Sequence, residues 1–295
     1  MKIRQSIGDR IFLGIIYAIL IICALMCLYP LFLIIISSFS DPAEVAKGKV
    51  LLYPIGLTFE AYIQTFRNDD IITGYGNSLF YMVVGTALNM LLTIPIAYSL
   101  SHPKVKGKSV VMKLIVFTMY FSGGMIPSFL LMKGMGLLNT YGAVLLSGGC
   151  SAYNLIIARS FFMSGVPREL EEAAEIDGCT PLQTFVKIVL PLSKAMLSVI
   201  LLYYAVGRWN DYTSSLYYQP SADNLHSLQM VLRVFVERAE REAMKDTEMG
   251  ISYWSDLIAQ LKYSIIVVAS VPLLVVYPFI QKYFEKGVML GSVKG

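Results

Sequence analysis

The chain has 295 residues, of which 56% are hydrophobic and only 15% are charged, and its formal net charge is +4. Soluble domains carry about a quarter charged residues, whereas here the charges gather in short patches between long charge-free stretches. These stretches are continuous rather than alternating in hydrophobicity, which excludes a transmembrane barrel and predicts membrane-spanning helices. No basic stripe with interleaved aromatic residues is present, so we expect no nucleic-acid partner.

Six apolar runs are long enough to cross a bilayer as helices. We place them at about 11–38, 78–100, 110–132, 141–162, 193–215 and 262–284. The first run is much longer than the core of a secretory signal, so it is expected to be a retained span. The predicted fold class is an all-α membrane protein of about six transmembrane helices, forming one domain over residues 1–295.

Lysine and arginine in short connections indicate orientation, because they gather on the cytoplasmic side of a membrane. The residues that carry this argument are Lys2, Arg4 and Arg10 before the first span, Lys104, Lys106 and Lys108 after the second, and Lys282, Lys286 and Lys294 after the sixth. Both termini are therefore predicted to face the cytoplasm. The segment 216–261, which is outside in this assignment, also carries basic residues, but long segments count for little under the rule.

Two long connections, residues 41–77 and 216–261, are predicted to lie outside the cell. The first contains the turn-forming pair Asp41-Pro42 and an amphipathic stretch around Tyr62, and the second contains an expected helix at about 224–243. Each segment either caps the external mouth and contacts an external partner, or is a plain connector. The sequence leaves both interpretations open.

The spans carry no pattern that indicates catalysis. Their apolar cores are expected to contain no Asp, Glu, Lys, Arg or His, which argues against a proton-coupled carrier. The four cysteines and two histidines are too few and too scattered for a metal site. Gly107-Lys108-Ser109 is similar to the end of a phosphate-binding loop, but the glycine required earlier is replaced by His102. We therefore predict a non-catalytic chain, with any ATP hydrolysed by another subunit.

Residues 164–192 connect the fourth and fifth predicted spans on the cytoplasmic side and are too polar to span the membrane. They predict two short helices joined by a turn. Pro167 suits the first helical position, Gly178 suits a left-handed C-terminal cap, and Thr180 with Gln183 makes a capping box. The second helix is expected to have one apolar face, made of Leu182, Phe185, Val186, Val189 and Leu190.

Such an elbow is typical of a device that docks into a groove on a partner and follows its motion. The alternative is an amphipathic loop that lies on the membrane. Three glutamates in one arm, at positions 169, 171 and 172, disfavour that alternative because anionic inner-leaflet lipids repel them.

The residue types and their spacing in this segment resemble the EAA loop of ATP-binding-cassette importer permeases. The resemblance rests on Glu172-Ala173-Ala174, Asp177-Gly178, Phe185, Ile188 and Leu190-Pro191. It extends over most of the chain, and three further segments are similar to the carbohydrate, maltose-type and oligosaccharide branch. These segments are Phe121–Pro127, Gly136–Thr140 and Trp209-Asn210-Asp211-Tyr212. The segment 216–261 is longer than in the maltose-type pattern, which puts the transfer of external contacts in doubt.

This resemblance implies a subunit of a bacterial plasma-membrane importer. A second, similar permease would complete the heterodimeric pathway, two cytoplasmic ATPases would bind ATP and magnesium, and an extracellular binding protein would deliver a carbohydrate. This chain itself would bind no cofactor and no metal. Importers of another solute such as a peptide, and less readily a secondary carrier, are the competing interpretations.

In the family the EAA loop is the coupling helix that docks on the ATPase. The resemblance assigns Glu171 and Glu172 to pairing with the ATPase, Ala173 and Ala174 to close approach, and Phe185 to an apolar pocket. The turn would be set by Asp177 and Gly178. Helix capping and local packing explain the same residues without a partner. The tail residues Val293, Lys294 and Gly295 are similar to a tail that reaches the ATPase interface.

Contacts with the substrate are expected from side chains that suit sugars, whose C–H faces meet aromatic rings and whose hydroxyls meet amides. The residues expected to line a pathway are Tyr120, Asn154, Tyr204, Trp209 and Asn210. Tyr204 and Trp209 suit the aromatic belt of the membrane interface equally well. Gly123-Gly124 with Pro127 is expected to break the third span near its middle, which would suit either a cavity or close helix packing.

Overall fold

The computed structural model describes residues 7–249, 256 and 260–275, and the elements in these ranges are helices. The predicted tail contacts Val293, Lys294 and Gly295 and the end of the sixth predicted span lie outside the described residues. The chain forms two compact units, Met1–Asn68 with Val234–Ser270 and Asp69–Arg233 with Val271–Gly295. Each unit is described by itself.

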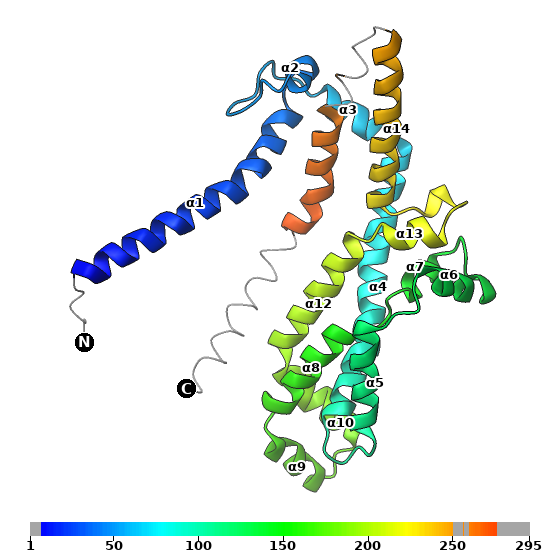
Figure 1. The fold of residues 1–295 in the computed structure, drawn as a ribbon. Helices are drawn as coiled ribbons and strands as arrows, with labels where there is room; N and C mark the ends of the chain where they lie inside the picture. Colours follow the sequence, from blue (N-terminus) through cyan, green and yellow to red (C-terminus); the bar gives the residue numbers. More distant parts are fainter. Residues whose placement is uncertain (1–6, 250–255, 257–259, 276–295) are drawn as a thin grey trace. The chain divides into compact units, whose positions relative to one another are not determined.

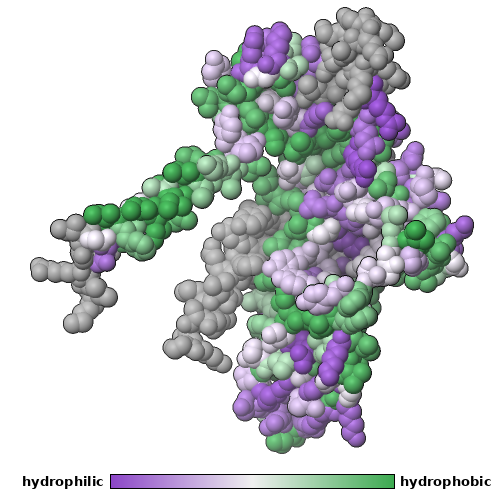
Figure 2. Space-filling view, viewed as in Figure 1, coloured by the Kyte–Doolittle hydropathy of each residue, from purple (hydrophilic) through white to green (hydrophobic). Residues whose placement is uncertain are grey.

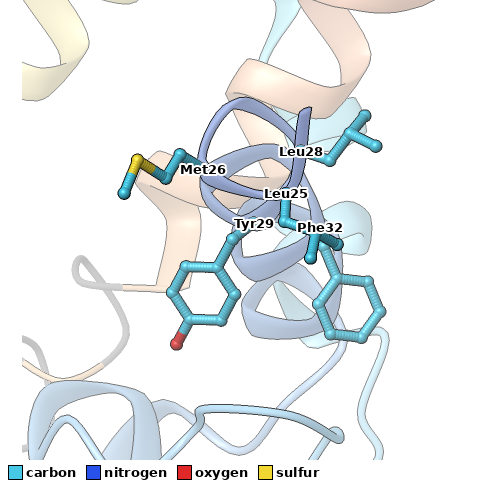
Figure 3. A pocket seen from close by; sticks show the side chains of 5 residues that line it. All are labelled: Leu25, Met26, Leu28, Tyr29 and Phe32. Carbon is cyan, nitrogen blue, oxygen red and sulfur yellow. The ribbon is translucent and has the colours of Figure 1, made fainter. Parts of the chain in front are cut away.

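The first unit begins with α1 (Ile7–Ser38), which is apolar on every side. A helix with this property belongs in a membrane or in the core of a large protein. Its side chains are largely exposed, and hydrophobic residues cover it in Figure 2. Figure 3 shows Leu25, Met26, Leu28, Tyr29 and Phe32 standing out from α1, and these are the described residues that line a hollow on this helix. This surface suits contact with lipid.

The end of α1 is held by the chain that follows it. α2 (Pro42–Ala46) is capped by Asp41, whose carboxylate accepts from the Ala43 amide. Next comes α3 (Glu60–Arg67). The Ser38 hydroxyl lies 2.8 Å from the Tyr62 hydroxyl, and the Phe39 ring stacks on the Tyr62 ring. The amphipathic stretch predicted around Tyr62 therefore packs against the end of the first span.

The second unit is built on α4 (Asp69–Ser101), α8 (Ala152–Ser164) and α12 (Lys194–Trp209), which lie side by side (Figure 1). Ala97 on α4 and Ala158 on α8 are fully buried, and such small residues let membrane helices approach closely. Ile200 and Phe162 complete the core between them.

Several predicted spans are interrupted. α5 (Lys108–Tyr120) and α6 (Met125–Gly134) meet at 114° around Gly123-Gly124, so the third run is broken where a break was expected. The fourth run is divided into α7 (Tyr141–Leu146) and α8, a break that the sequence analysis missed.

The fifth predicted run also differs from a continuous helix. α12 ends at Trp209, and α13 (Thr213–Tyr218) follows it. Among the described residues, α1 and α4 qualify as spans by length and composition, and two bent helix pairs would raise the number to four. The all-helical membrane fold is confirmed, while the count of six spans stays a prediction. In the second long connection, η2 (Asp223–Leu225) precedes α14 (Leu228–Met249), which begins four residues later than the helix expected there.

Candidate functional site

The segment between α8 and α12 folds as an elbow. α9 (Arg168–Ile176) starts after Pro167, one residue later than expected. Gly178 has a φ of +81°, so the predicted left-handed cap is confirmed. Thr180 and Gln183 form the predicted capping box at the start of α10 (Pro181–Thr184).

The second arm departs from the prediction because it contains a π-helical turn, η1 (Phe185–Val189), before α11 (Leu190–Leu192). A π turn holds more residues than an α turn and rotates the side chains that follow. The expected single apolar face is divided between buried and exposed side chains. Phe185 is buried and stacks on Tyr98 with ring centroids 4.8 Å apart, whereas Leu182 is 70% exposed.

An ionic bracket ties α9 to the end of α4. Arg168 donates to the backbone carbonyl of Ser101 at 2.9 Å and lies 3.3 Å from a Glu171 oxygen. The same Glu171 oxygen lies 3.4 Å from His102 Nε2 and accepts from the Tyr98 hydroxyl. Glu171 is thus buried and turned toward its own chain. A positive side chain at the C-terminal carbonyls of a helix is also favourable for the helix dipole.

A second ion pair reinforces this bracket from the surface. Lys104 Nζ lies 2.7 Å from a Glu175 oxygen. This hydrogen bond lowers the pKa of the Glu175 carboxyl and raises the pKa of the Lys104 ammonium group. A groove of about 500 Å³ lies between α9 and the α4–α5 connection.

The exposed side of α9 makes no hydrogen bond or ion pair to α4 in the described part of the chain, although Glu172 also lines the groove toward the α4–α5 connection. Glu172, Ala173 and Ile176 are exposed, and Ile176 is 87% exposed. Hydrophilic residues gather over this end of the molecule in Figure 2. The helix therefore divides its residues between one face that binds α4 and one face that offers a carboxylate, a small residue and a large apolar side chain outward.

The break in the fourth run is held by two residues one turn apart on α12. Tyr204 accepts a hydrogen bond at its hydroxyl from the Ser151 amide, at the N-terminus of α8. Arg208 donates to the backbone carbonyls of Val144 and Leu145, at the C-terminus of α7, at 2.6 and 2.8 Å. Because residues four apart share a helix face, α12 satisfies both sides of the 147–151 turn.

Asn89 and Gly85 on α4 complete this clamp. Asn89 accepts from Arg208 through its side-chain oxygen at 2.8 Å. A Cβ atom at Gly85 would come within 2.9 Å of Arg208 Nε, so glycine makes room for the guanidinium group. Arg208 is 6% exposed and lies in the predicted fifth span. The expectation that the apolar cores contain no ionisable residue was therefore wrong, and the reason is that backbone carbonyls and an amide satisfy this charge.

A polar pocket of about 460 Å³ opens beside this turn. Its lining includes Asn89, Asn154, Tyr204, Asn210 and Asp211. Irregular backbone at membrane depth occurs only where it is buried in protein or lines a cavity. The pocket therefore accounts for the broken helix.

A family model described as the binding-protein-dependent transport system inner membrane component matches residues 3–290. The chain belongs to this family. It is accordingly an inner-membrane transport component, a permease subunit located in the plasma membrane, and the resemblance drawn from the coupling segment is confirmed at the level of the family.

The permease is similar to several characterised proteins along its whole length. It is 44% identical to the "Polygalacturonan/rhamnogalacturonan transport system permease protein YtcP" of Bacillus subtilis (strain 168), over 97% of this chain and 99% of the relative. It is 40% identical to "Protein LplC" of the same organism, over 98% of this chain and 95% of the relative. A crystal structure of a bacterial ABC transporter that imports the acidic polysaccharide alginate matches with a TM-score of 0.84 and 36% identity, covering 96% of this chain and 100% of the matched chain.

Within the permease, the predicted docking residues fall into two groups. Glu172, Ala173, Asp177 and Gly178 are exposed. The other three, Glu171, Ala174 and Phe185, are buried inside the chain. An apolar contact for a partner was assigned to Phe185, but the most exposed apolar side chain on the first arm is that of Ile176, which the sequence analysis did not single out.

The predicted pathway residues of the permease are also divided. Asn154, Tyr204 and Asn210 line the polar pocket. Trp209 is fully buried and packs edge-to-face against Tyr75 at 5.5 Å, while Tyr120 is 79% exposed at the end of α5 and does not line the pocket. The interface-belt alternative therefore does not describe Trp209.

Arg168 and Arg208 were missed as site residues. Each had a sequence signal, because Arg168 stands three positions before Glu171 and Arg208 stands four positions after Tyr204. Both spacings place the two side chains on one helix face.

Proposed function

We propose that this chain is the permease subunit of an ATP-driven carbohydrate importer, in which it forms half of the translocation pathway beside a second, similar permease. A cytoplasmic ATPase would dock on the exposed face of α9, and an extracellular binding protein would deliver the sugar. The carbohydrate assignment is supported by the names of the relatives, which include a polygalacturonan/rhamnogalacturonan transport system permease and a transporter involved in the import of alginate. The orientation with both termini in the cytoplasm is part of this proposal.

The observation that carries the docking role is the division of α9. Its inner face is fixed by Glu171 to Arg168 and His102, so Glu172 and Ile176 are left for a partner. A carboxylate beside an exposed isoleucine matches the anatomy of a docking contact, in which an apolar anchor is flanked by charge. The tail that ends with Val293-Lys294-Gly295 belongs to the same proposal on its sequence resemblance alone.

The bracket supplies a path for the motion. Closure of the ATPase dimer would displace α9, and Arg168 would carry the displacement to Ser101 at the end of α4. Since α4 packs on α8 and α12, the three helices would move together as a rigid body. Alternating access then follows from a shift between two such arrangements.

The test is recovery of the ATPase. The chain is affinity-tagged and co-expressed with a candidate partner permease and a candidate ATPase, and ATPase recovery is compared for the parent, Glu172→Lys and Asp223→Lys. Asp223→Lys is the matched control, since Asp223 is also an exposed carboxylate but lies in η2, away from α9. We expect loss of the ATPase with Glu172→Lys alone. Equal recovery from all three would overturn the docking role.

A further inference from the structure

The polar pocket beside the 147–151 turn contains amide groups that the protein itself does not use. Asn154 is 6% exposed, and no hydrogen bond to its side chain is found within the described residues. Asn89 is 2% exposed and uses its side-chain oxygen for Arg208, and its amide nitrogen has no partner in the same part of the chain. Both residues line the polar pocket, so these amide groups are available there to a ligand or ordered water.

The guanidinium group of Arg208, which lines the pocket, already makes hydrogen bonds within the protein. Arg208 directs its two terminal nitrogens to the carbonyls of Val144 and Leu145 and to Asn89. Recognition of a carboxylate by arginine needs two free, parallel N–H groups, which Arg208 does not offer here. Arg208 therefore offers no bidentate contact to a carboxylate in this pocket, and its charge already interacts with that of Asp211.

The other charged group of the pocket is a carboxylate. One oxygen of Asp211 accepts from the Ser214 amide, and Asp211 lines the same pocket as Asn154. A carboxylate accepts hydrogen bonds from hydroxyls, and it repels an anionic ligand. The exposed Tyr203 ring lies at the same pocket and offers an apolar face. Carboxylate, amides and an aromatic ring together match the hydroxyls and C–H face of a sugar.

We propose that this pocket is a subsite for an uncharged sugar unit, with Asn154 and Asp211 as its hydrogen-bonding residues, and that it discriminates against a uronate at this position. The inference rests on the proposed carbohydrate function and narrows it. An acidic oligosaccharide would then place an uncharged unit here, and its carboxylates would have to be recognised outside this pocket.

The test uses the full chain in lipid nanodiscs and two matched probes, a 1,4-linked digalactoside and digalacturonate, which differ in a hydroxymethyl group against a carboxylate. Binding is measured by saturation-transfer NMR, which detects weak complexes. We expect the parent to bind the digalactoside about tenfold more tightly. Asn154→Leu should weaken digalactoside binding roughly three- to tenfold. The control is Gln64→Leu, which also replaces a side-chain amide by leucine but lies in α3, and it should not alter the binding.

Asp211→Asn keeps the shape of the side chain and removes its charge, so it tests the discrimination without a large risk of misfolding. It should strengthen digalacturonate binding and weaken digalactoside binding slightly, so that the ratio of the two affinities falls toward one. The inference is overturned if the parent binds both probes equally, or if Asn154→Leu, folded by its thermal unfolding curve, binds as the parent does. If the ATPase still co-purifies in that case, the proposed function stands and only the subsite fails.

Discussion

Arg168 and Arg208 both hold the ends of helices in this permease, but their surroundings differ. The Arg168 side chain is 30% exposed and pairs with the carboxylate of Glu171 as well as a backbone carbonyl. Arg208 is 6% exposed and is satisfied by two backbone carbonyls and an amide, with no carboxylate at ion-pair distance among the described residues.

This difference in burial and in partners suggests different roles for the two sites, one that moves and one that stays fixed. Partly exposed ion pairs contribute little free energy and can rearrange, because water replaces either partner at low cost. A buried cation held by backbone dipoles cannot move without leaving several polar groups unpaired. The bracket at α9 therefore suits a joint that transmits motion, and the clamp at the 147–151 turn suits a rigid lining.

The largest effect is expected from removing the buried cation. Arg208→Met leaves the carbonyls of Val144 and Leu145 and the Asn89 amide without their donor, so the free energy of unfolding should fall by about 3 kcal/mol or more. Unfolding in SDS titrations measures this change. Arg67→Met, at an exposed position of α3, is the matched control and should change it by less than about 0.5 kcal/mol. Equal unfolding curves for the two variants would contradict the structural role assigned to Arg208.

Gly178→Val tests whether the turn of the elbow depends on left-handed backbone. Valine at a φ of +81° should cost about 1–2 kcal/mol, measured as a lower free energy of unfolding, and should reduce recovery of the ATPase. Gly178→Asn is the control, since asparagine tolerates this conformation better. Nothing lies within 4 Å of a Cβ atom there, so a steric clash cannot explain a difference. If asparagine costs as much as valine, the conformational explanation is wrong.

Glu171→Gln tests the contribution of the ion pairs that tie α9 to the end of α4. It removes the charge that Arg168 and His102 share, yet the partial exposure of Arg168 limits the cost to about 1 kcal/mol. We expect a normal amount of bound ATPase but less transport for each ATP hydrolysed, because α9 would no longer move α4 firmly. Measuring ATP hydrolysis and uptake together in proteoliposomes separates this outcome from simple loss of docking, which would contradict the account.

The smallest effect belongs to Lys104 and Glu175, which are fully exposed. The pKa of Glu175 is lowered in the folded protein, so the stabilisation exists above its unfolded pKa and is lost as the pH falls through the folded value. The pKa of Lys104 is raised, so its part is lost as the pH rises through its folded value. Between these limits the contribution of this ion pair to the free energy of unfolding should not change with pH. A double-mutant cycle with Lys104→Met and Glu175→Gln should show a small coupling that disappears at high salt.

The elbow could be predicted because its determinants are local. Gly178, Thr180 and Gln183 act on neighbours within a few residues, and the acidic and small residues of α9 stand in one short segment. The direction of Glu171 could not be predicted in this way, because its partners Tyr98 and His102 come from the end of α4, about 70 residues earlier.

The pocket was predicted only in part for the same reason. Asn154, Tyr204 and Asn210 were chosen by their chemistry, and the structure brings them to one pocket. The break at 147–151 does contain a local turn signal, Gly148-Gly149, with a φ of +70° at Gly148. The sequence analysis did not use this signal, and the contacts of Tyr204 and Arg208 from α12 that hold the break could not be predicted locally. Tyr120 was chosen on the same chemistry, but α5 places it elsewhere.

Photo-crosslinking from position 176 tests the central claim most directly. A photoreactive amino acid replaces Ile176 in the complete importer, and a second variant carries it at Met125, which is also exposed but lies on α6. The account predicts that light yields a covalent adduct of the chain with the ATPase from position 176 and none from position 125. An intact importer that gives no ATPase adduct from position 176 would contradict it.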